Sequence, residues 1–419
     1  MKKLFILFLL FCSLANSYEL FAAEKQTIST QPRLDTPYSM MSSYTGQLQT
    51  WYVVLPDYYD PKKPGGYPVL YLLDGQYLLG HTATIAQFLQ GAMPSIIVVG
   101  IDNPDRMKTL TPPAIEFAES TKKPDSANTL TSSQTEQALN WPFMNFVQHE
   151  LMPQVDKTLN TAPYRLFAGH SLGGVAVLNS MILRPEMANA WLAFSPAMHW
   201  QDGATTTLLT HRLAALDSQE YLYIGYEIED VSSKPVFLQR HQQGLAQLNP
   251  LMKEHAPETL NWTLATFEHE DHITVAPLAQ HQAFRHLFSD WFLSATSIGD
   301  NISAITDWYQ QLSQRFGYPV VPEESELHQL TSYFSYGNKP EMALKIAELR
   351  VSWYSHSPYA HRSLALAQEA VGQSKQALQS LKLAHQYLNS KQSPMLSHEE
   401  RDRLTQEINT IKQRLVSSN

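Results

Sequence analysis

The stretch Gly169-His170-Ser171-Leu172-Gly173-Gly174 constrains the fold of this chain more than any other. The apolar run Tyr164–Ala168 precedes it and the helix-compatible run Val175–Leu183 follows it. The pattern Gly-x-Ser-x-Gly alone is weak, but a strand before it and a helix after it are the context that a nucleophile elbow needs. Glycines beside the serine suit a turn too tight for side chains. The motif therefore predicts that Ser171 presents its hydroxyl above the end of a sheet.

Strand-like and helix-like segments alternate from about residue 47 to residue 291, which is typical of an α/β fold. Several strand segments are continuous apolar runs, as expected for strands buried on both faces of a mostly parallel sheet. The expected strands are Gln49–Leu55, Val69–Leu73, Ser95–Ile101, Tyr164–Ala168, Ala190–Phe194, Tyr221–Tyr226 and Trp262–Phe267. The expected helices are Thr82–Leu89, Trp141–Leu159, Leu172–Leu183, Thr205–Leu216, Lys234–Leu248 and Pro277–Phe292. The polar stretch Thr111–Glu136 is expected to be a long loop, either functional or disordered.

Beyond Ser294 strand signals cease and the pattern becomes helical. Gly337 and Gly372, and Ala343 and Ala377, are offset by about 34 residues, the period of tetratricopeptide repeats. The expected helices are Ile302–Phe316, Ser325–Ser335, Met342–Val351, Tyr359–Ala370, Lys375–Leu388 and His398–Leu415. An ordinary helical bundle is the alternative. This part is expected to serve as an interaction or lid module.

The N-terminus is typical of a secretory signal. Lys2 and Lys3 precede a short apolar run to Cys12, and small polar residues follow up to Ser17. An uncleaved, membrane-tethered N-terminus is the alternative. Removal of a signal would take away the single cysteine, and with it any disulfide, thiolate nucleophile or Cys-ligated zinc. The expected location is therefore periplasmic or secreted, with no membrane span after cleavage.

The charge balance disfavours nucleic-acid partners. The whole chain has 30 basic and 39 acidic residues, and loss of Lys2 and Lys3 leaves 28 against 39, about −11. The length suggests two folded units. We expect a signal peptide at 1–17, ending at the latest at 23, an α/β domain at 24–297 and an all-α, tetratricopeptide-like domain at 298–419. The C-terminal helices are expected to bind a protein partner.

A serine hydroxyl needs a base, and the base needs an acid to fix its tautomer. In α/β-hydrolases the chain order is serine, acid, histidine, with the histidine beyond the last strand. His272 follows the strand that ends at Phe267, so it is the expected base. His269 is the competitor, while His199, His211, His241 and His255 fall too early in the chain.

The expected acid follows the strand Tyr221–Tyr226. Glu227 lies nearest to the strand end and is preferred, with Glu229 and Asp230 as alternates. Amide donors for an oxyanion are expected from Leu172, directly after the serine, and from Gln76 in the turn Asp74-Gly75-Gln76, which could also be a simple strand-ending turn.

A metal site is the competing interpretation of the segment His269-Glu270-Asp271-His272. Its spacing matches no helical His-Glu-x-x-His arrangement, and no third ligand stands out. We therefore expect neither a metal nor an organic cofactor.

Four segments together resemble the putative esterase family of α/β-hydrolases. They are Tyr71-Leu72-Leu73-Asp74-Gly75, the Gly169–Gly174 motif, Phe194-Ser195-Pro196 and Glu270-Asp271-His272. The segment Val99-Gly100-Ile101-Asp102-Asn103 to Arg106 is similar to the branch of siderophore trilactone esterases, in which tetratricopeptide-like C-terminal helices also occur. The resemblance implies Ser171 as nucleophile, His272 as base, and the amides of Leu172 and Gln76 as oxyanion donors. It also implies that Arg106 and Trp200 contact the substrate, although each could instead be structural.

The sequence thus predicts a serine esterase that works through an acyl-enzyme, acting on siderophore lactones or other bulky esters. Two alternatives use the same fold: a catalytically silent binding or scaffold protein that acts through its helices, and an acyltransferase that uses the same residues.

Overall fold

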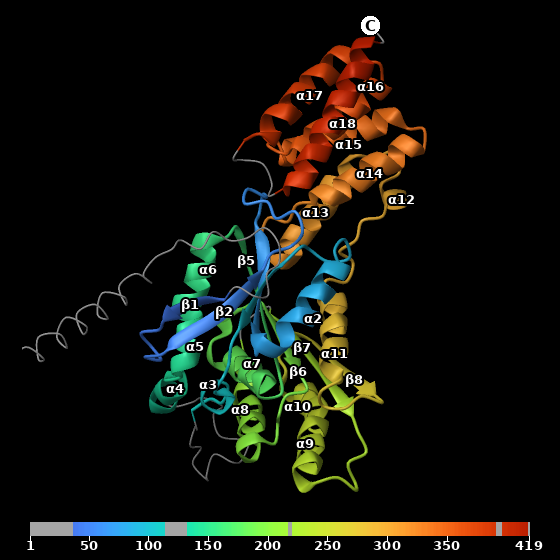
Figure 1. Ribbon diagram of the computed structural model, residues 1–419. Coiled ribbons are helices and arrows are strands. Elements are labelled where there is room, and N and C mark those ends of the chain that lie inside the picture. The colour runs from blue at the N-terminus through green and yellow to red at the C-terminus, as the bar shows by residue number, and fades with distance from the viewer. Residues whose placement is uncertain (1–36, 114–131, 217–219, 391–395, 418–419) are drawn as a thin grey trace, which may run out of the picture.

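The computed structural model describes residues 37–113, 132–216, 220–390 and 396–417. Its centre is an eight-stranded sheet in the order β1-β2-β4-β3-β5-β6-β7-β8 (Figure 1). Strand β2 pairs antiparallel with both of its neighbours, β1 and β4, and the other neighbouring strands are parallel. The strands are β1 (Tyr38–Met41), β2 (Leu48–Val54), β3 (Tyr67–Leu73), β4 (Ile97–Ile101), β5 (Thr161–His170), β6 (Ala190–Phe194), β7 (Tyr221–Ile228) and β8 (Asn261–Glu268).

The central strands are apolar because both faces of the sheet are covered. Every residue of β3, β4 and β6 is buried, as expected for parallel strands with helices on both sides. Alternate residues of β3 enter two separate cores: Val69 and Tyr71 lie in one, and Leu70 and Leu72 in the other. The period-two geometry of a strand therefore explains why a continuous apolar run is needed here.

Helices from different parts of the chain form the two layers. One core packs against α5 (Pro142–Phe146), α6 (Met152–Thr158), α7 (Leu172–Leu183), α8 (Ala204–Arg212) and α10 (Leu248–His255). The other packs against α2 (Gly75–Phe88), α11 (Val275–Leu287) and α13 (Ser303–Phe316). The remaining helices of this part are α3 (Arg106–Thr109), α4 (Ser132–Leu139) and α9 (Val236–Ala246).

The seven expected strands are confirmed, and β1 is an additional edge strand that the sequence pattern did not indicate. Helix α2 begins at Gly75 rather than Thr82, and a π-helical turn at Val147–Leu151 divides the long helix expected from Trp141 to Leu159. The prediction of a loop over Thr111–Glu136 is wrong for its last residues, because α4 begins at Ser132. Residues 114–131 of the predicted loop lie outside the described residues.

The C-terminal part is helical, as expected, and its helices stack on one another at one end of the molecule (Figure 1). They are α12 (Ala295–Ile298), α13, α14 (Glu324–Tyr336), α15 (Pro340–Trp353), α16 (Pro358–Ala370), α17 (Ser374–Leu388) and α18 (His398–Ser417). Each of the six expected helices is present. Leu381, Leu388 and Leu404 belong to the core that α16, α17 and α18 share.

These helices contact the edge of the sheet where the parallel strands begin. The ring of Phe316 lies 5.3 Å from that of Tyr164, near the start of β5. Before β3, Glu323 pairs with Lys63 at 3.4 Å, and His356 Nε2 lies 2.9 Å from a carboxylate oxygen of Asp60. The candidate site described below lies at the opposite edge of the sheet, and the role of these helices as an interaction or lid module stays a prediction.

The predicted signal segment, with Cys12, lies outside the described residues. Among the helices that the structure does describe, none has the length and apolar character needed to cross a bilayer.

Candidate active site

Ser171 lies at a sharp turn between β5 and α7, at φ 61° and ψ −118°. This conformation is strained for a residue with a Cβ and is typical of functional turns. Gly169 is required here, because a Cβ on it would lie 2.5 Å from the backbone carbon of Gly173. The glycines thus let the chain reverse tightly enough to leave the Ser171 side chain partly exposed at the end of the sheet.

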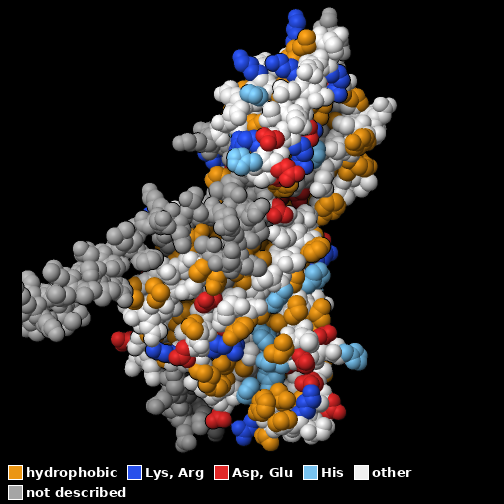
Figure 2. Space-filling model, viewed as in Figure 1, with side chains coloured by type: hydrophobic (Ala, Val, Ile, Leu, Met, Phe, Trp, Pro, Cys, Tyr) orange, Lys and Arg blue, Asp and Glu red, His pale blue; other side chains and the backbone are white. Residues whose placement is uncertain are grey.

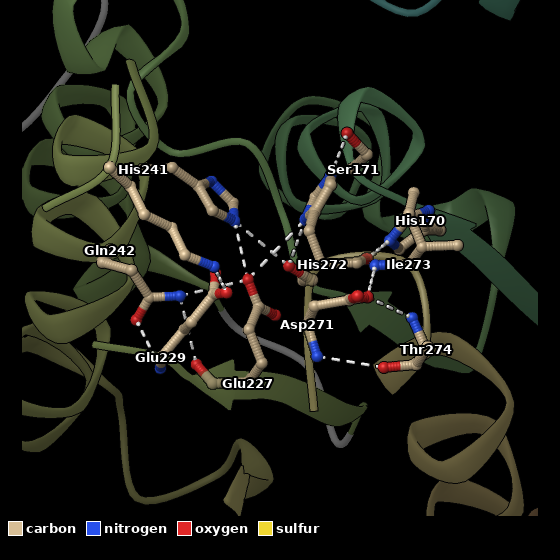
Figure 3. A network of polar contacts seen from close by, with 12 residues as sticks. His170, Ser171, Glu227, Glu229, His241, Gln242, Asp271, His272, Ile273 and Thr274 are labelled. Atoms are coloured by element: carbon tan, nitrogen blue, oxygen red, sulfur yellow. Dashed lines mark hydrogen bonds and ion pairs between the residues drawn. The ribbon is translucent and has the colours of Figure 1, made fainter. Parts of the chain in front are cut away.

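His272 reaches this hydroxyl from the loop after β8. Its Nε2 lies 2.9 Å from Ser171 Oγ, and its side chain is 25% exposed (Figure 3). His269, the competing histidine, lies at φ 68° on the surface. Two residues separate the two histidines, and His272 is the one turned toward the serine. An imidazole at this distance can accept the hydroxyl proton.

Of the three carboxylates weighed for the acid, Glu227 approaches His272. Its Oε1 lies 3.7 Å from His272 Nδ1, and its side chain is fully buried. Glu229 instead forms an ion pair with Lys234. Asp230 accepts a hydrogen bond from the Ser232 amide at 3.0 Å. The three carboxylates lie in one short segment, but their partners differ completely.

The charge of Glu227 is stabilised by hydrogen bonds. Burial raises the pKa of its carboxyl group, but the neighbouring polar side chains of His241, His272 and Ser195 outweigh burial and hold that pKa well below its ordinary value. Gln242 also donates to Oε1 at 3.1 Å. A buried glutamate in such surroundings is an anion at neutral pH.

Two residues of this network were missed by the sequence reasoning. Ser195, after β6, lies with its Oγ 2.8 Å from His272 Nδ1. His241, from α9, lies with its Nε2 3.0 Å from Glu227 Oε1 (Figure 3). Chain order excluded His241, because it precedes the last strand. Ser195 stood in a motif of the resembling family, but its contact depends on packing that no local pattern encodes.

The oxyanion donors proposed from sequence lie at helix N-termini. Leu172 begins α7, and Gln76 lies in the first turn of α2, where backbone N–H groups lack intrahelical acceptors. The two turns lie close together, because a Cβ on Gly173 would be 3.4 Å from Asp74 Oδ2. Asp74, the N-cap residue directly before α2, adopts φ 56°. The side chain of Gln76 bonds both backbone groups of Asn103, which fixes the turn.

Arg106 joins these two turns. It donates to both carboxylate oxygens of Asp74, at 2.9 and 3.0 Å, and Nη2 lies 3.5 Å from the His170 carbonyl oxygen. Burial raises the pKa of the Asp74 carboxyl, and the bonds from Arg106 oppose this effect. Arg106 is 34% exposed, so its structural role leaves one edge of the guanidinium accessible.

Trp200 lies after β6, just before a kink at Gln201 and Asp202. It is partly buried against the core that contains α7 and α8. Its indole Nε1 is buried and has no hydrogen-bond partner among the described residues. Packing therefore accounts for much of its surface.

Histidine side chains gather on this face of the molecule, away from the C-terminal helices (Figure 2). The ring of His241 packs edge-on against that of His272, with centroids 4.6 Å apart. Glu227, His241 and His272 each have a potential ligand atom within 4.8 Å of the others. Imidazole and carboxylate groups suit zinc, but these atoms already share hydrogen bonds with one another and with Ser195. Of the segment His269–His272, considered for a metal in the sequence, His272 contributes one of these ligand atoms, and the other two come from Glu227 and His241.

The strand order, the strained serine turn and the histidine beyond the last strand define an α/β-hydrolase. A family model described as "Putative esterase" matches residues 42–262, more than half of the chain. The protein therefore belongs to the putative esterase family, and it is a carboxylic ester hydrolase.

Individual relatives agree with this membership. The chain is 25% identical over 266 residues to the ferri-bacillibactin esterase BesA of Bacillus subtilis, covering 60% of this chain and 88% of that protein. An IroE-like serine hydrolase from Shewanella oneidensis has a similar structure, with a TM-score of 0.62 at 25% identity, over 76% of this chain and 99% of the other. An uncharacterised protein from Capnocytophaga ochracea shares the fold over 90% of this chain and 99% of its own length, at 17% identity and a TM-score of 0.53.

Proposed function

We propose that this esterase hydrolyses its substrate through an acyl-enzyme formed on Ser171, with His272 as general base and Glu227 as the acid partner. The observation that carries the proposal is the 2.9 Å contact between Ser171 Oγ and His272 Nε2 at a strained turn. The buried, ionised Glu227 lies on the other side of the same imidazole. Nucleophile, base and acid thus follow one another in space as covalent catalysis needs.

In the first half of the reaction, His272 Nε2 accepts the proton of Ser171 as Oγ attacks the ester carbonyl carbon. The same proton then passes from Nε2 to the leaving alcohol oxygen, and the C–O bond of the ester breaks. In the second half, His272 accepts a proton from water, whose oxygen attacks the acyl carbon. The bond between this carbon and Ser171 Oγ then breaks, the proton passes from His272 to Oγ, and the free acid leaves. The carboxylate of Glu227 stabilises the imidazolium that forms in both halves.

The negative charge on the carbonyl oxygen is stabilised by the amides of Leu172 and Gln76. Both amides lie at the start of a helix, where the helix dipole also favours an anion. Loss of one such donor typically costs about 100- to 1,000-fold in kcat. The Asp74–Arg106 ion pair supports this arrangement, because it holds the turn that carries Gln76 against the carbonyl oxygen of His170.

The substrate class that we propose is the siderophore lactone. Two similarities support this proposal. The match to the ferri-bacillibactin esterase covers 88% of the length of that relative, and the structure is similar to that of the IroE-like hydrolase. Arg106, one edge of which is accessible, is proposed to contact an anionic or carbonyl-rich substrate. Trp200 is proposed as a second contact, through the part of its ring that is not packed against the core.

We further propose that the protein works in the periplasm or outside the cell after removal of a signal peptide at 1–17. The lysines and the apolar run at the N-terminus support this location. The helical part from residue 298 onward is proposed to contain two tetratricopeptide-like units, α14–α15 and α16–α17, whose start points lie about one repeat period apart. A protein partner would bind there, far from the catalytic edge of the sheet.

A hydrolysis panel tests the proposed function. Purified protein is assayed with short-chain acyl esters, aryl esters and a catecholate trilactone, with and without iron, and products are identified by mass spectrometry. We expect the trilactone to have the highest kcat/KM and to give linear products. Ser171→Ala should abolish all hydrolysis. Ser180→Ala is the matched control, because Ser180 is fully buried in α7 and its hydroxyl has no partner among the described residues.

Two outcomes would overturn the proposal. Equal activity of wild type and Ser171→Ala would show that another group performs the chemistry. Efficient hydrolysis of simple esters with none of the trilactone would remove the substrate assignment but leave the mechanism intact. Addition of an alcohol acceptor separates hydrolysis from acyl transfer, and we expect the free acid rather than a new ester.

A further inference from the structure

Ser195 occupies an unusual position next to the candidate site. It follows β6 directly, is fully buried and adopts φ 38°, a left-handed conformation that is rare for serine. Its amide donates to the carbonyl of Gly225 at 2.7 Å, which fixes it between β6 and β7. A strained, fully buried hydroxyl at the catalytic edge of a sheet calls for an explanation in terms of its side chain.

The side chain of Ser195 lies closer to the imidazole of His272 than the carboxylate of Glu227 does. Oγ is 2.8 Å from His272 Nδ1, whereas Glu227 Oε1 is 3.7 Å from the same nitrogen. The serine hydroxyl also helps to hold the pKa of the Glu227 carboxyl low, and both Ser195 Oγ and Glu227 Oε1 lie within hydrogen-bond distance of His241 Nε2, at 3.2 and 3.0 Å. The nearest partner of Nδ1 is therefore a hydroxyl and not the acid, which is too far away for a strong hydrogen bond.

The direction of each hydrogen bond follows from the role of His272. To accept the proton of Ser171, Nε2 must be unprotonated, so the neutral ring carries its proton on Nδ1. Nδ1–H then donates to Ser195 Oγ, and the Ser195 O–H is left to donate to Glu227. In this arrangement each donor meets an acceptor.

His241 is consistent with the same direction. Its Nε2 lies 3.0 Å from Glu227 Oε1 and 3.2 Å from Ser195 Oγ. An Nε2–H that donates to the carboxylate prevents Ser195 from donating to this nitrogen. The hydroxyl hydrogen of Ser195 is thereby left to point toward Glu227, whose Oε1 also accepts from His241 and Gln242.

We propose that Ser195 is a positioning residue that relays the charge of Glu227 to His272. Its oxygen holds the imidazole in the tautomer that can deprotonate Ser171, and its O–H dipole, aligned by the carboxylate, stabilises the imidazolium in the transition state. No proton moves along the relay, and the carboxylate stays ionised throughout. The inference rests on the proposed function, because it assigns a role toward the base of that reaction.

The test compares Ser195→Ala with the wild type and with Ser180→Ala, which removes an equally buried hydroxyl from α7. Alanine keeps the Cβ of serine, so the substitution removes only the hydroxyl group. We expect kcat for Ser195→Ala to fall by about 10- to 100-fold, as for loss of a hydrogen bond to a charged group, with KM within about twofold. Ser180→Ala should match the wild type in both constants.

A double-mutant cycle separates a relay from a structural role. If Glu227 acts through Ser195, the change Glu227→Gln should cost much less in the Ser195→Ala background than in the wild type. A proton NMR spectrum gives a second readout, since an Nδ1–H in a strong hydrogen bond resonates far downfield of the amide region. This signal should be lost or displaced in Ser195→Ala and retained in Ser180→Ala.

Three results would overturn the relay: a kcat of Ser195→Ala within twofold of the wild type, additive costs in the cycle, or an unchanged downfield signal. If Ser195→Ala does not fold, Ser195→Cys takes its place, because a thiol is a weaker donor at the same position and should give an intermediate kcat. Ser171→Ala, assayed in parallel, tests the proposed function separately. Full activity of that variant would refute the mechanism, whereas a normal Ser195→Ala refutes only the relay.

Discussion

The side chain of His170, the residue before Ser171, holds the backbone of His272. Its Nε2 lies 2.6 Å from the carbonyl oxygen of His272, and the two imidazole rings lie 4.7 Å apart. The carbonyl can only accept, so Nε2 of His170 carries a proton and donates. The loop that bears His272 is thus attached to the same turn that bears Ser171.

Replacing His170 with alanine should therefore lower activity without removing any reacting group. We expect kcat/KM to fall by about 10- to 100-fold, because small displacements of a base are costly. His281→Ala, on the exposed side of α11, is the control and should have no effect. Steady-state kinetics on an ester substrate check this, and unchanged kinetics of His170→Ala would refute the positioning role.

The same residue should make stability depend on pH. Burial, with the nearby His272, lowers the pKa of His170 to about 3, below its ordinary value of 6.5. The unfolded chain then binds the proton more strongly, so the stabilisation is complete above pH 6.5 and is lost as pH falls toward 3. Urea unfolding between pH 7 and pH 4 should show a steeper loss for the wild type than for His170→Ala. Parallel curves would contradict this assignment.

Glu227→Gln tests the acid. The amide keeps the shape of the side chain but cannot stabilise an imidazolium, so kcat should fall by about 100- to 10,000-fold with little change in KM. Glu229→Gln is the matched control, because Glu229 is paired with Lys234, and it should remain within about twofold of the wild type. If both variants behave alike, Glu227 is not the acid.

Glu326, a buried glutamate in the C-terminal part, should make the protein less stable as the pH rises, whereas His170 makes it less stable as the pH falls. Burial and the charge of Glu323 raise the pKa of Glu326 to about 7 from 4.5, although the hydroxyl of Tyr309 donates to it at 2.6 Å. Its stabilisation is complete below pH 4.5 and is lost as pH rises to 7.

Glu326→Gln cannot ionise, so its stability relative to the wild type should rise between pH 5 and pH 8, by at most about 3 kcal/mol. The exposed Glu348→Gln on α15 is the control and should show no such trend. Urea unfolding at several pH values provides the measurement. A constant difference between Glu326→Gln and the wild type would contradict the raised pKa.

Two glycines test the geometry of the serine turn. Gly169→Ala would place a Cβ 2.5 Å from the backbone of Gly173, so we expect loss of folding or of all activity. Gly80→Ala in α2 meets nothing within 4 Å and should stabilise the protein by about 1 kcal/mol. Thermal unfolding and activity assays distinguish the two. An active, stable Gly169→Ala would show that the turn is looser than described.

The sequence allowed prediction of the elements whose signal is local. The buried strand Ala190–Phe194 and helix Leu172–Leu183 have the expected bounds, because an apolar run and a glycine-bounded turn determine them directly. The edge strand β1 was missed, since only its pairing with β2 makes it a strand. The start of α2 at Gly75 was missed as well, because Asp74 begins that helix in a left-handed conformation.

The candidate site was also predictable only in part. Chain order and strand ends sufficed to propose Ser171 and His272, and they narrowed the acid to three neighbouring carboxylates. Which carboxylate turns inward depends on partners far along the chain, such as His241 on α9. Ser195 stands in a motif that pointed to the family but not to its contact with His272, because that contact forms only once β6, β7 and the loop after β8 lie side by side.

The central claim is that Ser171 is the nucleophile activated by His272, and covalent labelling with a fluorophosphonate tests it most directly. Mass spectrometry of the digested protein should find one adduct, on the peptide that contains Ser171. Labelling should be much slower in His272→Ala and absent in Ser171→Ala. A folded wild-type protein that takes no label, or takes it at another serine, would contradict the account.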